Sequence, residues 1–249
     1  MTDDRGPDAS PEPPAPPWQR LPPERGRRGG RDPITRELIV DTALRLLDRD
    51  GLDQLSMRRI ADELDTGPAS LYWHVGSKDG LLDLVFDRVI GEQQEPDAEP
   101  ERWQEQLKEV ARSMRATILR HRDIVRISIG RIPMGPNALL FSERILAVLR
   151  GGGVPDRLAV TGHHLLFAIV NGFTLDETVD LGDEGAAPVD QASADMARDY
   201  IAALPIDRFP NLVAVADHYA FADSDRRFDL LIDLYVDGLA QHAAAERDR

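Results

Sequence analysis

The 249-residue sequence contains no cysteine, few aromatic residues and no long apolar run. The absence of cysteine excludes disulfide bonds and thiolate metal sites, and it fits the reducing cytoplasm. No run of about 18 apolar residues indicates a membrane span, and the first 30 residues lack the apolar core of a secretory signal. We therefore expect a cytoplasmic protein with no membrane contact.

Enzyme signatures are also missing. We find no Ser–His–Asp order, no HExxH zinc motif and no glycine loop of the kind that holds phosphate. The glycine run at 151–153 lacks the lysine and the strand-then-helix setting of such a loop, so we interpret it as a connector. The adjacent His163 and His164 would point about 100° apart on a helix, which disfavours a shared metal ion. We expect no catalytic residue, no cofactor and no metal, although a helical enzyme remains an alternative that measured turnover would reveal.

The charge of the chain is strongly negative and unevenly distributed. The formal net charge of −14 and the pI near 4.8 argue, taken alone, against nucleic acid as a partner, because phosphate binding depends on cationic side chains. However, residues 20–31 hold five arginines and one acidic residue, whereas the chain from Gly80 onward holds 18 basic and 29 acidic residues. The local arginines leave DNA binding open. The acidic balance keeps a ligand-binding or scaffold protein that does not bind DNA as an alternative.

Residues 1–32 are expected to form a disordered Pro/Arg-rich arm. They contain eight of the 18 prolines and almost no apolar residue, so burial cannot offset the entropy cost of ordering them. The arm is either a plain solvated tail or a DNA contact through Arg25, Arg27, Arg28 and Arg31.

Helical spacing begins after the arm. Asp32 suits an N-cap, Pro33 the first helical position and Gly51 the stop. The break at residues 93–100 predicts a head at 33–92 and a larger helical body at 99–249. The body shows no strand alternation, so the expected fold is all-α, with a loop at 181–190. Apolar spacing predicts helices in the body at 101–121, 123–129, 137–150, 156–180, 191–203, 209–220 and 224–245.

Two short helices within the head form a helix-turn-helix pattern. Ser56 suits the cap of the first, residues 65–67 make a tight turn, and Pro68 opens a second helix that ends near Val75. The major groove of DNA admits one helix, and the turn holds the second helix out so that its N-terminal residues meet base edges. Ser77 then caps a further helix, which we expect to join the head to the body and to act as a lever.

The head resembles the tetracycline-repressor (TetR) family, and within it most strongly the tetracycline repressor itself. The resemblance covers residues 34–90 and is carried by the segment LDQLSMRRIADELDTGPASLYWHVGSKDGLLDLV, above all by its LYWHV run. A weaker similarity continues through HRDIVRISIGRIP. It implies a DNA-binding head of three helices followed by a ligand-binding and dimerisation domain. The implied protein is a transcriptional repressor that a small-molecule inducer releases from a palindromic operator, although activation stays open.

The resemblance also assigns DNA contacts by position. It implies that Arg58 pairs with guanine, that Ser70 touches a base and that Trp73 packs at the groove edge. The phosphate or sugar contacts that it implies are Tyr72, His74 and Lys78. The positions that it implies for setting the operator sequence are Thr66, Gly67, Pro68 and Ala69. Plain structural alternatives exist, because Tyr72 and Trp73 could be partly buried aromatics and Arg58 a solvated surface charge.

The family resemblance further implies a homodimer and a ligand cavity. In similar proteins the helices equivalent to residues 158–173 and to the last helix form a four-helix bundle across a two-fold axis. Such a dimer presents two heads to double-stranded operator DNA roughly 34–36 Å apart, about one helical turn. The small-molecule effector is not identified. Cavity candidates, each of which could instead be core, are Trp103, Met114, Ile118, Phe141, Arg144, His164, Phe167, Asn171 and Asp176.

Two positions depart from the tetracycline repressor. Ser128 stands where that protein has the histidine that holds the drug-bound metal, and Arg144 stands where it has the glutamine that reads the drug. These departures imply that tetracycline–magnesium is not the effector here. An arginine in a cavity would suit an acidic or carbonyl-bearing ligand instead.

Overall fold

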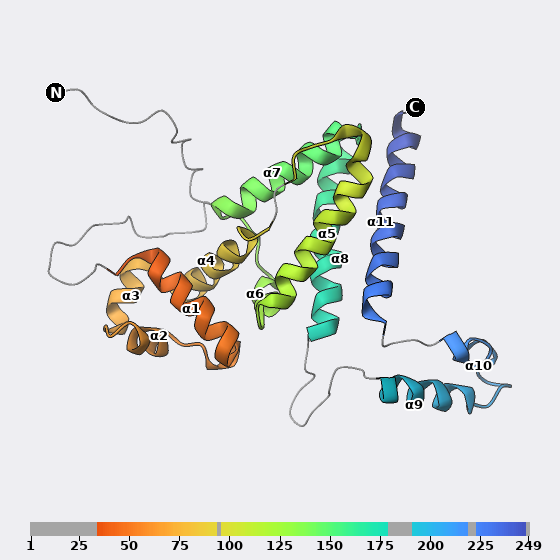
Figure 1. Ribbon diagram of the computed structural model, residues 1–249, viewed down its shortest axis with the longest axis horizontal. Coiled ribbons are helices and arrows are strands. Elements are labelled where there is room, and N and C mark those ends of the chain that lie inside the picture. The colour runs from red at the N-terminus through yellow and green to blue at the C-terminus, as the bar shows by residue number, and fades with distance from the viewer. Residues whose placement is uncertain (1–33, 94–95, 179–190, 219–222, 248–249) are drawn as a thin grey trace. The chain divides into compact units, whose positions relative to one another are not determined.

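The structure is helical throughout the residues that it describes. It is a computed structural model, and it describes residues 34–93, 96–178, 191–218 and 223–247. These residues form α-helices and short 3-10 helices and contain no strand (Figure 1), which confirms the predicted all-α fold. The expected arm at 1–32 and the expected loop at 181–190 lie outside the described residues.

The chain divides into two compact units. The first contains the residues up to Ala98 together with Ala116–Val148, and the second contains Glu99–Arg115 together with the residues from Leu149 onward. Two helices, α5 (Trp103–Arg120) and α7 (Pro136–Gly151), therefore contribute residues to both units.

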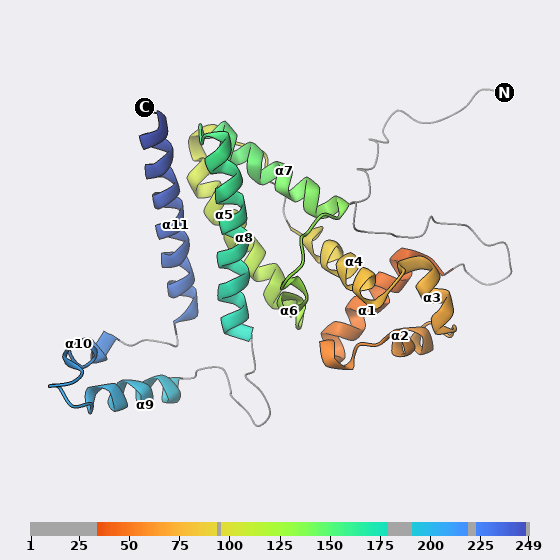
Figure 2. The ribbon, with the colours of Figure 1, turned by 180° about the vertical axis from the view of Figure 1, so that it is seen from behind.

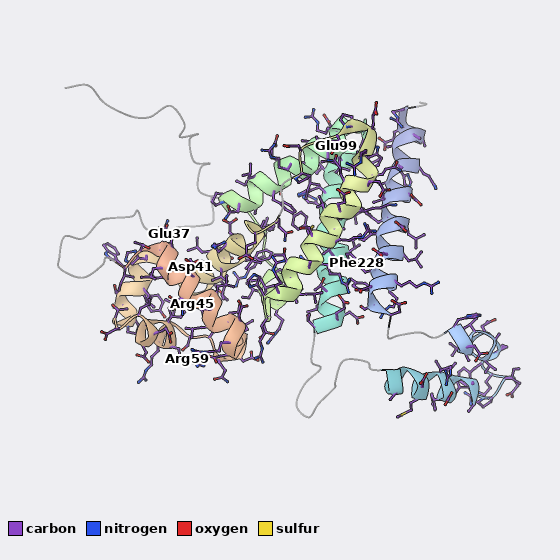
Figure 3. The ribbon with its side chains drawn as sticks, in the orientation of Figure 1. Glu37, Asp41, Arg45, Arg59, Glu99 and Phe228 are labelled. Carbon is purple, nitrogen blue, oxygen red and sulfur yellow. The ribbon has the colours of Figure 1, made fainter. Side chains whose placement is uncertain are left out.

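The first unit begins with α1 (Arg36–Asp50). The expected cap at Asp32 is wrong, because Ile34 and Thr35 precede the helix and are not helical. Thr35 is the cap instead, and its Oγ1 accepts a hydrogen bond from the Leu38 amide at 3.2 Å, which satisfies one of the amides that have no partner within the helix. Gly51, at φ +83°, ends the helix as predicted. The outer side of α1 carries the charged residues labelled in Figure 3: Glu37, Asp41 and Arg45.

Four short elements complete the head. They are η1 (Leu52–Gln54), α2 (Met57–Glu63), α3 (Pro68–Val75) and α4 (Lys78–Ile90). The predicted caps are confirmed, since Ser56 Oγ accepts from the Arg59 amide at 3.3 Å and Ser77 Oγ accepts from the Gly80 amide at 2.9 Å. Arg59, labelled in Figure 3, also pairs through Nη2 with Asp50 Oδ2 at 2.7 Å and so ties α2 to α1.

A buried carboxylate joins α4 to the start of α7 within the first unit. Asp87 Oδ1 accepts the Ala138 amide at 2.9 Å, and Asp87 Oδ2 accepts the side-chain amide of Asn137 at 3.1 Å. The N-terminus of a helix carries unpaired amides and a partial positive charge, so the carboxylate caps α7 from a neighbouring helix. The short helix α6 (Ile124–Ser128) precedes α7 in the chain and follows Asp123, which has a left-handed backbone conformation at φ +60°.

The second unit is built around α8 (Asp156–Thr178) and α11 (Ser224–Arg247), which lie side by side in Figures 1 and 2. Tyr235 Oη donates to the Gly162 carbonyl at 2.7 Å. A Cβ at Gly162 would lie only 3.1 Å from the Leu239 side chain, so glycine permits the close approach of the two helices. The remaining elements of this unit are η2 (Pro100–Arg102), α9 (Gln191–Ala202), α10 (Pro210–Ala214) and η3 (Ala216–His218).

Arg115 of α5 links the C-terminal end of α8 to the N-terminal end of α11. Its Nη2 lies 2.6 Å from Glu177 Oε1, and its Nη1 lies 2.8 Å from Asp225 Oδ1. Its guanidinium also lies 4.9 Å from the ring centre of Phe228, which Figure 3 labels on α11. Ser224 donates a short hydrogen bond to Glu177. The half-buried Arg115 therefore contacts residues of two other helices, α8 and α11.

The helices of the body occur where apolar spacing predicts them, with one exception. The expected helix at 209–220 divides into α10 and η3, because Val215 leaves helical geometry at φ −111° and ψ 8°. Among the described helices, α8 is long and apolar enough to cross a membrane by length and composition, with a mean hydropathy of 1.4 over its most apolar 18 residues. Some apolar side chains of α8 are buried, whereas others, such as Val160 and Leu165, are exposed.

Candidate DNA-binding and effector sites

Helix α3 has one buried and one exposed side. Leu71 and Val75 are buried, whereas Tyr72 and Trp73 are 46% and 61% exposed. The Arg36 Nε donates to the His74 carbonyl at 3.2 Å, which holds the end of α3 against α1. The exposure of both aromatic side chains favours a contact with a partner over the alternative that they are core residues.

The N-terminal end of α3 is small and open. Gly67, Pro68 and Ala69 are exposed, and Thr66 and Ser70 are half-buried. A Cβ built on Gly67 meets nothing within 4 Å, so no side chain of the described residues blocks this end of the helix. A surface of this kind allows close approach to another molecule, and Thr66 and Ser70 offer hydroxyl groups at its edge.

Polar groups flank the exposed side of α3. Tyr72 is exposed, His74 is half-buried, and Lys78 is exposed at the first position of α4. Lys78 thus belongs to the N-terminal turn of α4, where unpaired amides and the positive end of the helix dipole favour an anion such as phosphate. The three side chains thus include one phenol, one imidazole and one cation that can all donate hydrogen bonds to phosphate oxygens.

Arg58 projects from α2. Its side chain is 85% exposed, and it pairs with Asp62, with Nε and Oδ2 4.0 Å apart. An exposed pair at this distance contributes little to stability, typically about 0–1 kcal/mol. The guanidinium can therefore exchange this contact for a bidentate contact to a base edge at small cost.

The predicted effector residues of the first unit are Ile118, Phe141 and Arg144. Ile118 and Phe141 are buried, which is equally consistent with core packing. Arg144 is half-buried, and its Nη1 lies 3.8 Å from Asp97 Oδ1. Its guanidinium therefore already lies near a carboxylate of the same unit.

The predicted effector residues of the second unit differ in exposure. Met114 is buried, and Trp103, Phe167 and Asn171 are half-buried, whereas His164 and Asp176 are exposed. Asp176 lies 3.5 Å from Arg227 Nη2, so it contacts α11. Trp103 packs so closely over Gly152 that a Cβ there would lie 2.2 Å from the indole Cγ. Among these six residues, His164 and Asp176 are therefore the most accessible to solvent.

His163, which the sequence suggests only as a possible metal ligand, is more buried than its neighbour His164. It is half-buried, and its ring centre lies 5.0 Å from that of Phe167. Burial, helped by the charge of His164, lowers the pKa of His163 to about 4. Its buried Nε2 has no hydrogen-bond partner among the described residues. The spacing of four residues between His163 and Phe167 was a signal that both share one side of the helix.

Several large apolar side chains are exposed along α8 and α11. Leu230 and Leu234 of α11 are 59% and 65% exposed, and Val160 and Leu165 of α8 are 48% and 47% exposed. The described residues contain no group of three or more histidine or acidic side chains that could hold a metal ion. The second unit thus offers an apolar surface and one half-buried imidazole rather than a cluster of charged ligands.

Two protein-family models match this chain, one over the head and one over the body. The family model described as "Bacterial regulatory proteins, tetR family" matches residues 39–85, and the model described as "Tetracyclin repressor-like, C-terminal domain" matches residues 95–243. Apo ActR from Streptomyces coelicolor is 46% identical with a TM-score of 0.79, and the match covers 87% of this chain and 100% of ActR.

A second ActR structure, in complex with actinorhodin, is 47% identical with a TM-score of 0.77, over 84% of this chain and 97% of ActR. An HTH-type transcriptional regulator from Saccharopolyspora erythraea is 41% identical over 120 residues, which are 48% of this chain and 51% of that protein. The chain thus spans about half the length of this curated relative. On the strength of the two family matches, the chain belongs to the tetracycline-repressor (TetR) family of bacterial regulatory proteins, as its head sequence predicts.

Proposed function

We propose that this protein is a one-component transcriptional repressor that binds a palindromic operator as a homodimer and is released by a small-molecule effector. The observation that carries the proposal is the exposed side of α3, where Tyr72 and Trp73 project from a helix whose opposite side is anchored by Leu71. In this proposal the head at 33–92 reads DNA, and the body at 99–249 dimerises and binds the effector. It acts in the cytoplasm, carries no cofactor and is not an enzyme.

The DNA contacts follow from the surface of the head. Arg58 reads guanine, because its exposed guanidinium can form two parallel hydrogen bonds to that base. Residues 66–69 set the operator sequence and Ser70 touches a base, while Tyr72, His74 and Lys78 hold the phosphate backbone and Trp73 packs at the groove edge. The acidic net charge does not prevent this, because phosphate contacts depend on the local charge of the head.

The homodimer is supported by the apolar side chains exposed along α8 and α11. Four large apolar residues lie on neighbouring helices of one unit, and surfaces of this kind in soluble proteins mark sites of association. An isologous contact between two copies creates a two-fold axis. A two-fold protein with two heads binds two equivalent half-sites, which is why the operator is palindromic.

The effector is proposed from two observations. ActR has been crystallised with actinorhodin, so actinorhodin is the first compound to test. In this chain the buried Nε2 of the half-buried His163 can accept a hydrogen bond from a hydroxyl group of an effector that packs on Phe167. Ser128 is buried and its Oγ donates to the Val125 carbonyl at 2.7 Å, so it offers no replacement for the metal-holding histidine of the tetracycline repressor.

The test begins by selecting bound duplexes from a random-sequence DNA library with the full-length protein. We expect a palindromic consensus, and we expect log affinity to fall linearly with log salt concentration. Actinorhodin, added to the complex in a gel-shift assay, should release the DNA while sedimentation still detects a dimer. Recovery of no sequence above the starting library would contradict the repressor and favour a ligand-binding protein that does not bind DNA.

A further inference from the structure

The charges of α2 are arranged against its own dipole. Arg58 and Arg59 stand in its first turn, and Asp62 and Glu63 stand in its last turn. The N-terminus of a helix carries a partial positive charge and the C-terminus a partial negative one, so each of these four charges lies at the end that disfavours it. The stability of α2 alone therefore does not explain why these residues are present.

Contacts with neighbouring elements of the head account for two of the four charges. Arg59 Nη2 pairs with Asp50 Oδ2 at 2.7 Å, and Arg59 Nη1 donates to the Gln54 carbonyl at 3.3 Å. Glu63 Oε1 lies 3.7 Å from Arg45 Nη1 of α1. Arg59 and Glu63 thus hold α2 to the elements before it in the chain.

Arg58 and Asp62 instead pair with each other. Residues four positions apart on a helix lie on the same side of it, and these two side chains are 85% and 70% exposed. Oδ2 of Asp62 lies 4.0 Å from Nε of Arg58. An exposed pair at this distance adds little to stability. Because the pair does little for the fold and stands against the helix dipole, it indicates a role in binding.

The pair with Asp62 engages the Nε side of Arg58 and leaves Nη1 and Nη2 for another partner. A guanidinium is planar and holds its N–H donors in a fixed fork. Guanine offers O6 and N7 as acceptors in the major groove, and the two Nη groups can donate to both at once. Arg58 can give up its weak contact with Asp62, but this end-on contact does not require it to do so. A carboxylate beside Nε therefore fixes the direction in which the Nη end points.

The charge of Asp62 also affects binding to phosphate. Residues 34–93 hold seven arginine and lysine residues and twelve aspartate and glutamate residues, so the head is itself acidic. Binding that does not depend on DNA sequence relies on cations that neutralise phosphates. A carboxylate 4.0 Å from Arg58 repels phosphate, whereas guanine carries no net charge for it to repel. Asp62 thus weakens binding to the backbone more than binding to the base.

We propose that Asp62 is a positioning residue that sets the specificity of Arg58: it directs the Nη end of the guanidinium to guanine and keeps the arginine from binding phosphate. This inference rests on the proposed function, because it takes DNA as the partner and Arg58 as the residue that reads guanine. It adds to that function a carboxylate that itself makes no contact with DNA. The effect appears in the ratio of specific to non-specific affinity.

The test measures the affinity of full-length protein for the selected duplex and for a duplex of scrambled sequence over a salt series. Asp62→Asn, which keeps the shape but removes the charge, should bind the scrambled duplex about threefold to fivefold more tightly and the selected duplex no more tightly than wild type. Asp62→Glu, which returns a carboxylate, should restore the wild-type ratio. Asp207→Asn, at an exposed aspartate of the second unit, makes the same change in net charge and should leave the ratio unchanged.

A double-mutant comparison separates positioning from bulk charge. In an Arg58→Ala background, Asp62→Asn should no longer change the ratio, because its effect acts through the arginine. Two results would overturn the inference: an Asp62→Asn variant that keeps the wild-type ratio, or one that lowers the ratio equally with and without Arg58. If the wild type selects no duplex, the proposed function fails and the inference fails with it. If it selects a duplex and Arg58→Ala keeps the full base preference, the inference fails while the repressor proposal stands.

Discussion

The carboxylate of Asp87 on α4 accepts the backbone amide of Ala138 on α7 at 2.9 Å, although the two residues are 51 positions apart. Asp87 is buried, and burial raises the pKa of its carboxyl while the hydrogen bonds from Ala138 and Asn137 oppose that rise. The contact gives an N-terminal amide of α7 a partner that α7 itself does not supply. It also makes the position of α4 depend on that of α7.

Replacing Asp87 by Asn should destabilise the protein by about 1–3 kcal/mol, because the amide nitrogen of Asn cannot accept a hydrogen bond and a buried donor loses its partner. Urea unfolding monitored by circular dichroism measures the change. Asp207→Asn, at an exposed aspartate of the second unit, is the matched control and should change the unfolding free energy by less than about 0.5 kcal/mol. Equal effects of the two substitutions would contradict the capping role.

Gly135→Ala tests how closely the same two segments approach. A Cβ at Gly135 would lie 2.2 Å from the carboxylate carbon of Asp87, so either the carboxylate or the start of α7 must move. We expect a loss of about 1–3 kcal/mol in unfolding free energy, which is the usual cost of overpacking. Gly67→Ala, where an added Cβ meets nothing within 4 Å, should leave stability nearly unchanged. An unchanged unfolding free energy for Gly135→Ala would show that the contact between Asp87 and the start of α7 can relax without cost.

Arg58→Ala and Lys78→Ala should weaken operator binding in different ways. Loss of Arg58 should reduce affinity for the selected duplex about tenfold or more and relax the preference at one base pair of each half-site. Loss of Lys78 should weaken all sequences alike and reduce the salt slope by about one per head. Fluorescence anisotropy over a salt series measures both effects. Arg247→Ala, at an exposed arginine near the end of α11, is the control, and an identical loss there would refute the assignment.

Leu234→Glu should convert the proposed dimer to a monomer. The side chain is 65% exposed on α11, so the substitution leaves the fold of one chain intact but places two like charges near the two-fold axis. Sedimentation velocity should show a smaller species, and operator affinity should fall because the two heads are no longer linked. Ile206→Glu, which is 67% exposed outside α8 and α11, should keep the wild-type mass. Retention of the dimer by Leu234→Glu would mean that another surface associates.

Arg115→Met should make the protein less stable at neutral pH and less sensitive to acid. Hydrogen bonds from Arg115 and Ser224, acting against burial, lower the pKa of Glu177. A lowered carboxyl pKa contributes stability that is present above the unfolded value of about 4.3 and is lost as the pH falls through the folded value. The Arg115 and Glu177 side chains are 14% and 13% exposed, so breaking the pair should cost about 3–5 kcal/mol at neutral pH. Unfolding between about pH 7 and pH 3 measures both changes, and parallel curves for variant and wild type would contradict the role of the pair.

Local chemistry explains which features were predictable. Ser56, Pro68 and Ser77 mark helix starts, because a hydroxyl cap or a fixed φ acts within three residues of the helix that it begins. The family resemblance of the head is carried by a contiguous stretch around α3 and is confirmed. The predicted cap at Asp32 is wrong because two candidate caps stand three residues apart, and the helix begins directly after Thr35.

The amino-acid sequence by itself determined the all-helical fold, the order of the helices and the family of the chain, because helix periodicity and caps depend on neighbours a few positions away. Only the tertiary structure decided that Asp87 caps α7 and that His121 bridges Asp48 and Glu92. The register of a packed helix and the partners of a buried charge depend on surfaces that meet across 29 to 73 residues of chain, and no local pattern encodes that meeting.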